Sequence, residues 1–264
     1  MGPETPGSSA PVRALVGCSG WSYKDWRGTV YPENMPSRQW FSQYVKLFGT
    51  VELNSTFYRL PPPETFSLWR GEAPEGFVFA VKVNSYGTHR LKLLRPSTWL
   101  TNYLERAVLL GPALGPNLVQ LPPHWKRDTS RLRDFLQFAT AASDRLQASF
   151  PAGGARWAVE FRDPSWLDEP TYEVLRDNGA ALCCHDLVEG HPWLLTARWA
   201  YVRFHGPQGS AAKYAGEYGV ARLRPPAEVI RAWLEQGCDV YAYFNNDVGG
   251  AAVRDATSMA GLLA

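Results

Sequence analysis

The chain has little of what marks secreted, membrane-spanning or metal-stapled proteins. It contains four cysteines in 264 residues, and none forms a C-x-x-C pair, so we predict neither a disulfide framework nor a zinc knuckle. No apolar run approaches the roughly 18 residues that cross a bilayer. The first residues, MGPETPGSSAPVR, lack the apolar core of a secretory signal. We therefore expect a soluble, cytoplasmic protein with no membrane partner.

A strong charge of either sign is also absent. The formal net charge is +2 and the isoelectric point is near 8.3, so the whole-chain charge does not favour nucleic acid as a partner. Any basic patch would have to be local. The H-E-x-x-H motif and other close metal-ligand spacings are missing, so we predict no bound metal and no cofactor.

What the chain does have is a repeated pattern of short apolar runs, each ending in polar residues and leading into helical spacing. Eight such units are the number that closes a parallel barrel with helices outside, and 264 residues suit a fold that typically takes about 250. We therefore predict an α/β fold, a single-domain TIM-type (β/α)8 barrel over residues 14–264, preceded by a flexible leader over residues 1–13. The runs are 15–18, 51–54, 78–84, 117–121, 157–162, 180–186, 201–205 and 240–246.

The segments between these runs carry helix signals. Residues 130–146 have the clearest amphipathic spacing. Asp163, followed by a proline, is typical of a helix N-cap. Pro225 and Pro226 are expected to open the helix after the seventh run, and residues 192–196 form only an irregular element.

Side-chain alternation places many polar residues inside the barrel. Because successive strand residues point to opposite faces, Val159 and Phe161 face the helices while Glu160 and Arg162 face inward. A barrel core normally holds branched apolar side chains, so a polar inner row indicates function at the strand ends. The same alternation places Glu52, Asn54, Lys82, Gln120, Arg203, His205 and Asn245 inward.

The inward charges leave an excess of one positive charge. The acids Glu52 and Glu160 face three bases, and buried charges must be paired or bind a ligand. This balance suits an anion such as a phosphate or carboxylate, held by the bases and oriented by Asn54, Gln120 and Asn245. The alternative is an internal ion-pair network that fixes the barrel register. The three bases are Lys82, Arg162 and Arg203.

Glu160 and His205 are the candidate catalytic residues. A carboxylate at Glu160 could abstract or relay a proton, with His205 as its proton partner. An equally weighted alternative is that Glu160 only holds Arg162 or Lys82.

The mouth of the barrel offers further candidates. The glycine-rich segment 206–219 and the helix start at Asn246 have the composition of a barrel phosphate site, or of ordinary turns. The aromatic side chains Trp21, Tyr23 and Tyr58 could stack on a sugar or base. Trp125 and Trp166 are further aromatic candidates at this rim.

An alternative prediction is a metal site formed by carboxylate and imidazole side chains at the strand ends. Carboxylate and imidazole ligands hold metals in barrel hydrolases. Three bases already supply positive charge to the same place, which argues against a cation there. The ligands of such a site would be Glu52, Glu160, His185, Asp186 and His205.

Seven blocks of the chain carry recognisable motifs: 17–23, 52–58, 79–82, 120–123, 160–162, 203–206 and 243–246. In sequence and in order they resemble the domain of unknown function 72 (YecE-like) family. The resemblance implies a TIM barrel and does not imply an activity. The barrel is also similar to the endonuclease IV-like and xylose isomerase-like group, but this chain lacks the His-rich metal set of that group's nucleases.

Three functional hypotheses follow. The first is an enzyme, of a hydrolase type, that acts on an anionic substrate such as a phosphate ester at the C-terminal face of the barrel. The second is a non-catalytic protein that binds nucleic acid or a nucleotide, with affinity that falls steeply with salt. The third is a metal-dependent, phosphodiesterase-like hydrolase.

Overall fold

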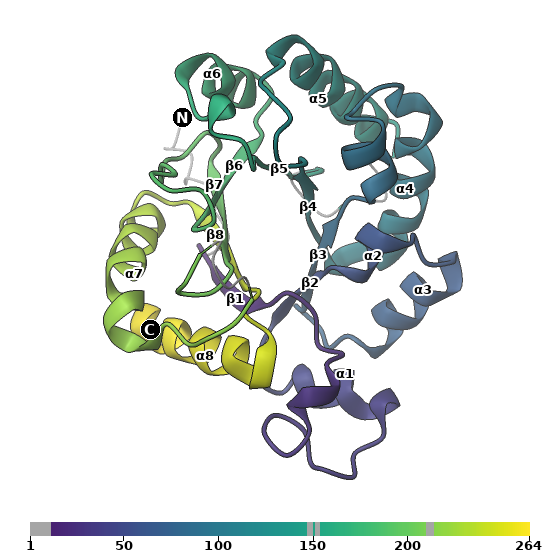
Figure 1. Cartoon of the computed structure of the whole chain (residues 1–264). Coiled ribbons are helices and arrows are strands. Elements are labelled where there is room, and N and C mark those ends of the chain that lie inside the picture. Colours follow the sequence, from purple (N-terminus) through teal and green to yellow (C-terminus); the bar gives the residue numbers. More distant parts are fainter. Residues whose placement is uncertain (1–11, 147–149, 151–153, 210–213) are drawn as a thin grey trace, which may run out of the picture.

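The computed structural model describes residues 12–146, 150, 154–209 and 214–264. Eight parallel strands close into one barrel in chain order, and helices surround it (Figure 1). The predicted TIM-type fold is confirmed. The strands are β1 (Ala14–Cys18), β2 (Thr50–Leu53), β3 (Val78–Lys82), β4 (Leu114–Gln120), β5 (Trp157–Glu160), β6 (Ala181–His185), β7 (Trp199–Phe204) and β8 (Asp239–Phe244).

The outer layer departs from one helix per strand. Two helices lie between β2 and β3, and the connection from β6 to β7, described throughout, contains no helix, as the irregular segment 192–196 predicts. No helix in the described part of the chain is long and apolar enough to cross a membrane. The helices are α1 (Trp40–Tyr44), α2 (Ser55–Tyr58), α3 (Pro63–Glu72), α4 (Leu100–Ala107), α5 (Thr129–Asp144), α6 (Glu169–Asp177), α7 (Gly219–Glu235) and α8 (Ala251–Leu263).

The start of α7 differs from the prediction, and the predicted leader lies largely outside the described residues. Helix α7 begins at Gly219, so Pro225 and Pro226 lie inside the helix and do not open it. Each proline removes one backbone hydrogen bond, and the carbonyls that lose their partners belong to residues 221 and 222, which are exposed to solvent. Of the leader predicted over residues 1–13, residues 1–11 lie outside the described residues.

The inside of the barrel is divided into an apolar lower half and a charged upper half. Tyrosines occupy part of the lower half and bond through their hydroxyls, as buried tyrosines require. Tyr243 bonds Thr50 at 2.7 Å, and Tyr201 donates to Glu52 Oε2 at 2.7 Å. The charged groups therefore lie above a sealed floor, toward the C-terminal strand ends. The lower half consists of Val78, Ala80, Leu118, Ala158, Ala181, Cys183, Trp199, Tyr201, Tyr241 and Tyr243.

The barrel is joined between β1 and β2 largely through a side chain. The two strands pair at a single position, Cys18 opposite Val51. The hydroxyl of Tyr44, from α1, accepts from the Cys18 N–H at 2.8 Å and donates to the Thr50 carbonyl at 2.9 Å. A Cβ on Gly17 would lie 2.3 Å from that carbonyl oxygen, so only glycine permits this approach of the two strands.

Candidate functional site

Arg203 lies at the centre of the charged layer, fully buried between two carboxylates. Its Nη2 atom is 2.8 Å from Glu52 Oε1, and its Nη1 atom is 2.6 Å from Glu160 Oε2. These contacts join β2, β5 and β7 across the barrel. Glu52 and Glu160, which the sequence predicts to face inward, therefore offset the positive charge of Arg203, as a buried ion requires.

Glu160 is paired on both oxygens. Oε1 accepts from Arg162 Nε and Oε2 accepts from Arg203 Nη1. Burial alone would raise the pKa of Glu160, but the two guanidinium groups outweigh burial and hold the pKa well below its usual range. A carboxylate that is charged, paired and fully buried has little capacity to accept a further proton.

His205 is neutral and fixed in one tautomer. Its Nε2 atom lies 3.1 Å from Arg203 Nη1 and 3.2 Å from Arg162 Nη2, and guanidinium groups only donate. The proton is therefore on Nδ1, which donates to Asp186 Oδ1 at 3.1 Å. Burial, reinforced by Arg203, holds the pKa of His205 well below its usual range. The Tyr218 hydroxyl also donates to Asp186 and so fixes the orienting carboxylate.

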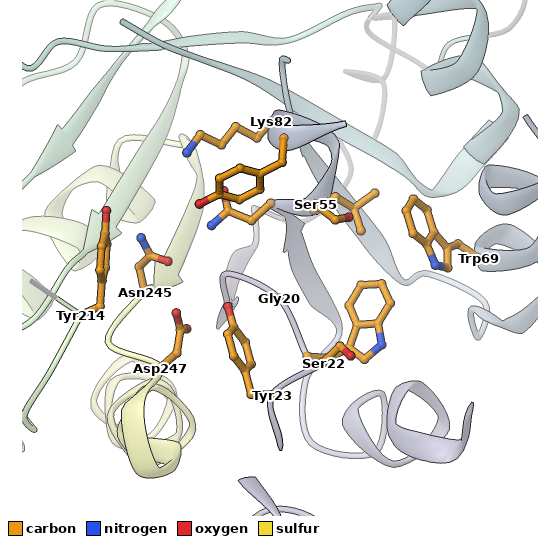
Figure 2. Close-up of a pocket in the computed structure, with 13 residues that line it drawn as sticks. Gly20, Ser22, Tyr23, Ser55, Trp69, Lys82, Tyr214, Asn245 and Asp247 are labelled. Carbon is orange, nitrogen blue, oxygen red and sulfur yellow. The ribbon is translucent and has the colours of Figure 1, made fainter. Parts of the chain in front are cut away.

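A cavity of about 610 Å³ opens beside this network, within the usual size of small-molecule sites. Its walls come from the chain after β1, from β2 and α2, from the end of β3, and from the segment after β8, with one residue each from α3 and the loop after β7. Figure 2 shows Tyr23, Lys82, Tyr214, Asn245 and Asp247 arranged around a common space. The lining residues are Gly20, Trp21, Ser22, Tyr23, Leu53, Asn54, Ser55, Tyr58, Trp69, Lys82, Tyr214, Asn245 and Asp247.

Lys82 is the unneutralised cation of the inner row. It is 6 % exposed and lines the cavity, and no side chain in the described part of the chain forms an ion pair or hydrogen bond with its Nζ atom. Its Nζ atom lies 4.1 Å from the centre of the Phe57 ring. Such a contact favours the ammonium by about 2 kcal/mol or somewhat more in a desolvated site, whereas burial, aided by Arg203, lowers the pKa of Lys82 from 10.5 to about 7. Burial is the larger effect.

Asp247 faces the same cavity with spare hydrogen-bonding capacity. Its Oδ1 atom is buried and has no hydrogen-bond partner among the described residues. Burial raises the pKa of Asp247 well above its usual range, which favours the protonated, donating form. Asn54 donates to Ser19 Oγ at 2.8 Å and leaves its buried Oδ1 unpartnered. The cavity therefore combines one amine, one carboxyl group and amides.

Most of the predicted site residues fall into two groups. Six line the cavity, and five others lie in the ion-pair network next to it. Gln120 is buried and lies outside the cavity wall. Asn246 also lies outside it, because its amide donates to Asp255 Oδ2 at 2.7 Å. The cavity group is Trp21, Tyr23, Asn54, Tyr58, Lys82 and Asn245; the network group is Glu52, Glu160, Arg162, Arg203 and His205.

Three other predictions at the mouth have different outcomes. Trp125 and Trp166 pack against each other with ring centres 5.4 Å apart, and both are buried away from the cavity. The backbone amide of Gly249, where a phosphate was anticipated, donates to Asp25 Oδ2 at 2.7 Å. Of the residues required for the metal alternative, Glu52 and Glu160 are paired with arginines. His205 and Asp186 are hydrogen-bonded to each other, and His185 bonds to backbone groups. The described residues contain no group of three metal-ligating side chains.

The sequence did not single out Ser55, Trp69, Tyr214 or Asp247 as cavity residues. Trp69 and Tyr214 come from a helix and a loop, where strand alternation gives no information. Asp247 carried a signal, since it follows Asn245 and Asn246 at the end of β8, but it was interpreted as part of a helix start.

These features define a TIM-barrel protein with a ligand-sized cavity at the C-terminal strand ends, next to a buried ion-pair network. The model of the family described as protein of unknown function DUF72 matches residues 15–264. The chain belongs to the DUF72 family, as its motifs predict.

Curated relatives and solved structures agree with this assignment. The chain is 27 % identical over 280 residues to UPF0759 protein YunF of Bacillus subtilis, covering 94 % of each chain. It is 27 % identical over 165 residues to UPF0759 protein YecE of Escherichia coli K12, covering 62 % of this chain and 54 % of that one. A DUF72 family structure from Thermotoga maritima matches with TM-score 0.77 and 29 % identity, covering 95 % of this chain and 99 % of the other. One from Enterococcus faecalis shares the fold, with TM-score 0.74 and 20 % identity over 95 % of each chain.

Proposed function

We propose that the protein is an enzyme that binds a small anionic molecule, a carboxylate or a phosphate ester, in the cavity beside Lys82. The observation that carries this proposal is the charge balance of the inner row. Arg162 and Arg203 are paired with Glu160 and Glu52, so Lys82 supplies the excess positive charge. An anion is the ligand that offsets an unpaired buried cation.

The other lining groups support an anionic ligand of modest size. Asn54 and Asn245 provide amides, and the carboxyl of Asp247 can donate when protonated. The aromatic rings of Trp21 and Tyr58 provide apolar surface for the remainder of the molecule. In this proposal Glu160 and His205 are positioning residues, because they hold Arg162 and Arg203 and do not line the cavity.

A ligand-induced thermal shift tests the proposal. Phosphate, lactate and glycerol phosphate are titrated against the wild type, Lys82→Met and the exposed control Lys46→Met. A ligand at about 100 times its dissociation constant stabilises the folded state by about 2.7 kcal/mol. Loss of one charge-assisted contact should weaken binding by about tenfold to a hundredfold in Lys82→Met, with no change in the control. Equal shifts in all three proteins, or no shift with any anion, would contradict the proposal.

A further inference from the structure

Lys82 has the surroundings of a nucleophilic amine as well as those of an anion-binding cation. Its Nζ atom is held against the Phe57 ring at 4.1 Å, a contact that fixes the amine without accepting its proton. No carboxylate in the described part of the chain pairs with it, so no acid group holds it in the ammonium form. A desolvated lysine beside other cationic groups is a recognised way of obtaining a reactive amine at neutral pH.

The charged groups around Lys82 work in opposite directions. Arg203 and Arg162 favour the neutral amine, and Glu160 and Glu52 favour the ammonium. Because each glutamate already contacts a guanidinium group, their pull on Lys82 is largely offset. Burial then decides the balance, and a substantial fraction of Lys82 is unprotonated near neutral pH.

Asp247 supplies the second group that amine chemistry requires. Its carboxyl lines the same cavity as Lys82 and has one buried oxygen without a partner among the described residues. Figure 2 shows the two side chains on walls of one space, from β3 and from the segment after β8. A carboxyl group kept protonated by burial can act as a general acid.

We propose that Nζ of Lys82 forms an imine with the carbonyl carbon of a small carbonyl compound that also carries a carboxylate or phosphate. This inference rests on the proposed function, since the anionic group is what the cavity binds. The iminium formed on Lys82 retains one positive charge. The anionic group therefore keeps its electrostatic partner after the reaction.

The step balances with the groups present. The Nζ lone pair attacks the carbonyl carbon, the C=O π pair moves to oxygen, and one proton passes from nitrogen to that oxygen. Asp247 then protonates the resulting hydroxyl, the C–O bond breaks, and water leaves while the nitrogen lone pair forms the C=N bond. The products are a protonated imine on Lys82, one water and the carboxylate of Asp247.

Reductive trapping tests this inference. The full chain is incubated at neutral pH with pyruvate or dihydroxyacetone phosphate plus cyanoborohydride, and modified lysines are identified by peptide mapping. A trapped imine increases the mass by that of the probe less one oxygen. We expect Lys82 to be labelled at least about tenfold faster than exposed lysines such as Lys46, because far more of it is unprotonated. Lactate and glycerol phosphate, which lack the carbonyl, should compete without forming an adduct.

Two variants separate the roles of the residues. Lys82→Arg keeps a positive charge but cannot form an imine, so labelling at position 82 should be lost while the thermal shift with lactate is retained. Asp247→Asn keeps Lys82 and should slow labelling by about a hundredfold; it also keeps the test valid if Lys82→Arg does not fold. Equal labelling of Lys82 and Lys46 would overturn the inference.

The thermal shifts distinguish failure of the inference from failure of the proposed function. Probe-induced shifts without any adduct on Lys82 would overturn imine formation and leave anion binding standing. An adduct on Lys82 without a shift from any carbonyl-free anion would overturn anion binding and retain the amine chemistry.

Discussion

Replacing Lys82 with methionine should stabilise the protein at neutral pH, although it removes a charged residue from the centre of the molecule. Burial lowers the pKa of Lys82 from 10.5 to about 7, and at 1.36 kcal/mol per tenfold change this equals about 5 kcal/mol against the ammonium. Between pH 7 and pH 10.5, the folded and unfolded pKa values of Lys82, the unfolded chain binds more protons than the folded chain. The free energy of unfolding of the wild type therefore rises with pH through this range. Methionine is unbranched like lysine and only one atom shorter, so it fills most of the same space, and its thioether packs favourably against an aromatic ring such as that of Phe57.

The stabilisation should therefore depend on pH in a defined way. Linkage gives a gain of about 4 kcal/mol for Lys82→Met at pH 7 and about 1.5 kcal/mol near pH 9.5. Urea unfolding followed by tryptophan fluorescence measures both values, with Lys46→Met as the exposed control that changes little. A variant less stable than wild type at pH 7, or a gain equal at the two pH values, would refute the argument that burial is uncompensated at Lys82.

Two further predictions concern the stability of the fold. Arg203→Met should destabilise the fold by about 3–5 kcal/mol in the urea titration, because it leaves two buried carboxylates without their shared partner. The same substitution at Arg176, which is in an exposed ion pair, should have little effect. A similar loss at both sites would contradict this reasoning. Asp163→Ala should cost about 1 kcal/mol in thermal unfolding, because Asp163 accepts from the Ser165 N–H at 3.0 Å as an N-cap. Asp163→Asn, which keeps the acceptor, should recover most of that loss, and failure to do so would assign the effect to the Lys126 ion pair instead.

Strand alternation predicted which side chains point inward but could not predict what they contact there. A period of two residues is a local property of a strand, so Glu52, Glu160 and Arg203 could be assigned to the inner face from sequence. Whether a carboxylate meets a guanidinium group or a ligand depends on distances across the barrel, between residues as far apart as Glu52 and Arg203. The sequence therefore predicted an excess of one positive charge, and only the structure shows that Lys82 is the base that carries it.

The residues that sequence reasoning missed are those that loops and helices bring to the mouth. Trp69 and Tyr214 reach the cavity from α3 and from the loop after β7, where no periodic pattern relates sequence position to direction. The two prolines Pro225 and Pro226 led to a wrong prediction of where α7 begins. Proline is a start signal in the first turn, but here the helix continues through both prolines, and the carbonyls that they free belong to solvent-exposed residues.

The phenol of Tyr44 links β1 to β2 where the ring of paired strands has its fewest residue pairs. Strand β1 pairs with β8 at five positions and with β2 at one, so the two hydrogen bonds of this side chain supplement a sparse backbone pairing. The residues that follow β1, from Gly20 to Tyr23, form one wall of the cavity. Because that wall leaves β1 directly after Cys18, whose N–H donates to the Tyr44 hydroxyl, a buried side chain of α1 helps to set where one side of the cavity lies relative to β2.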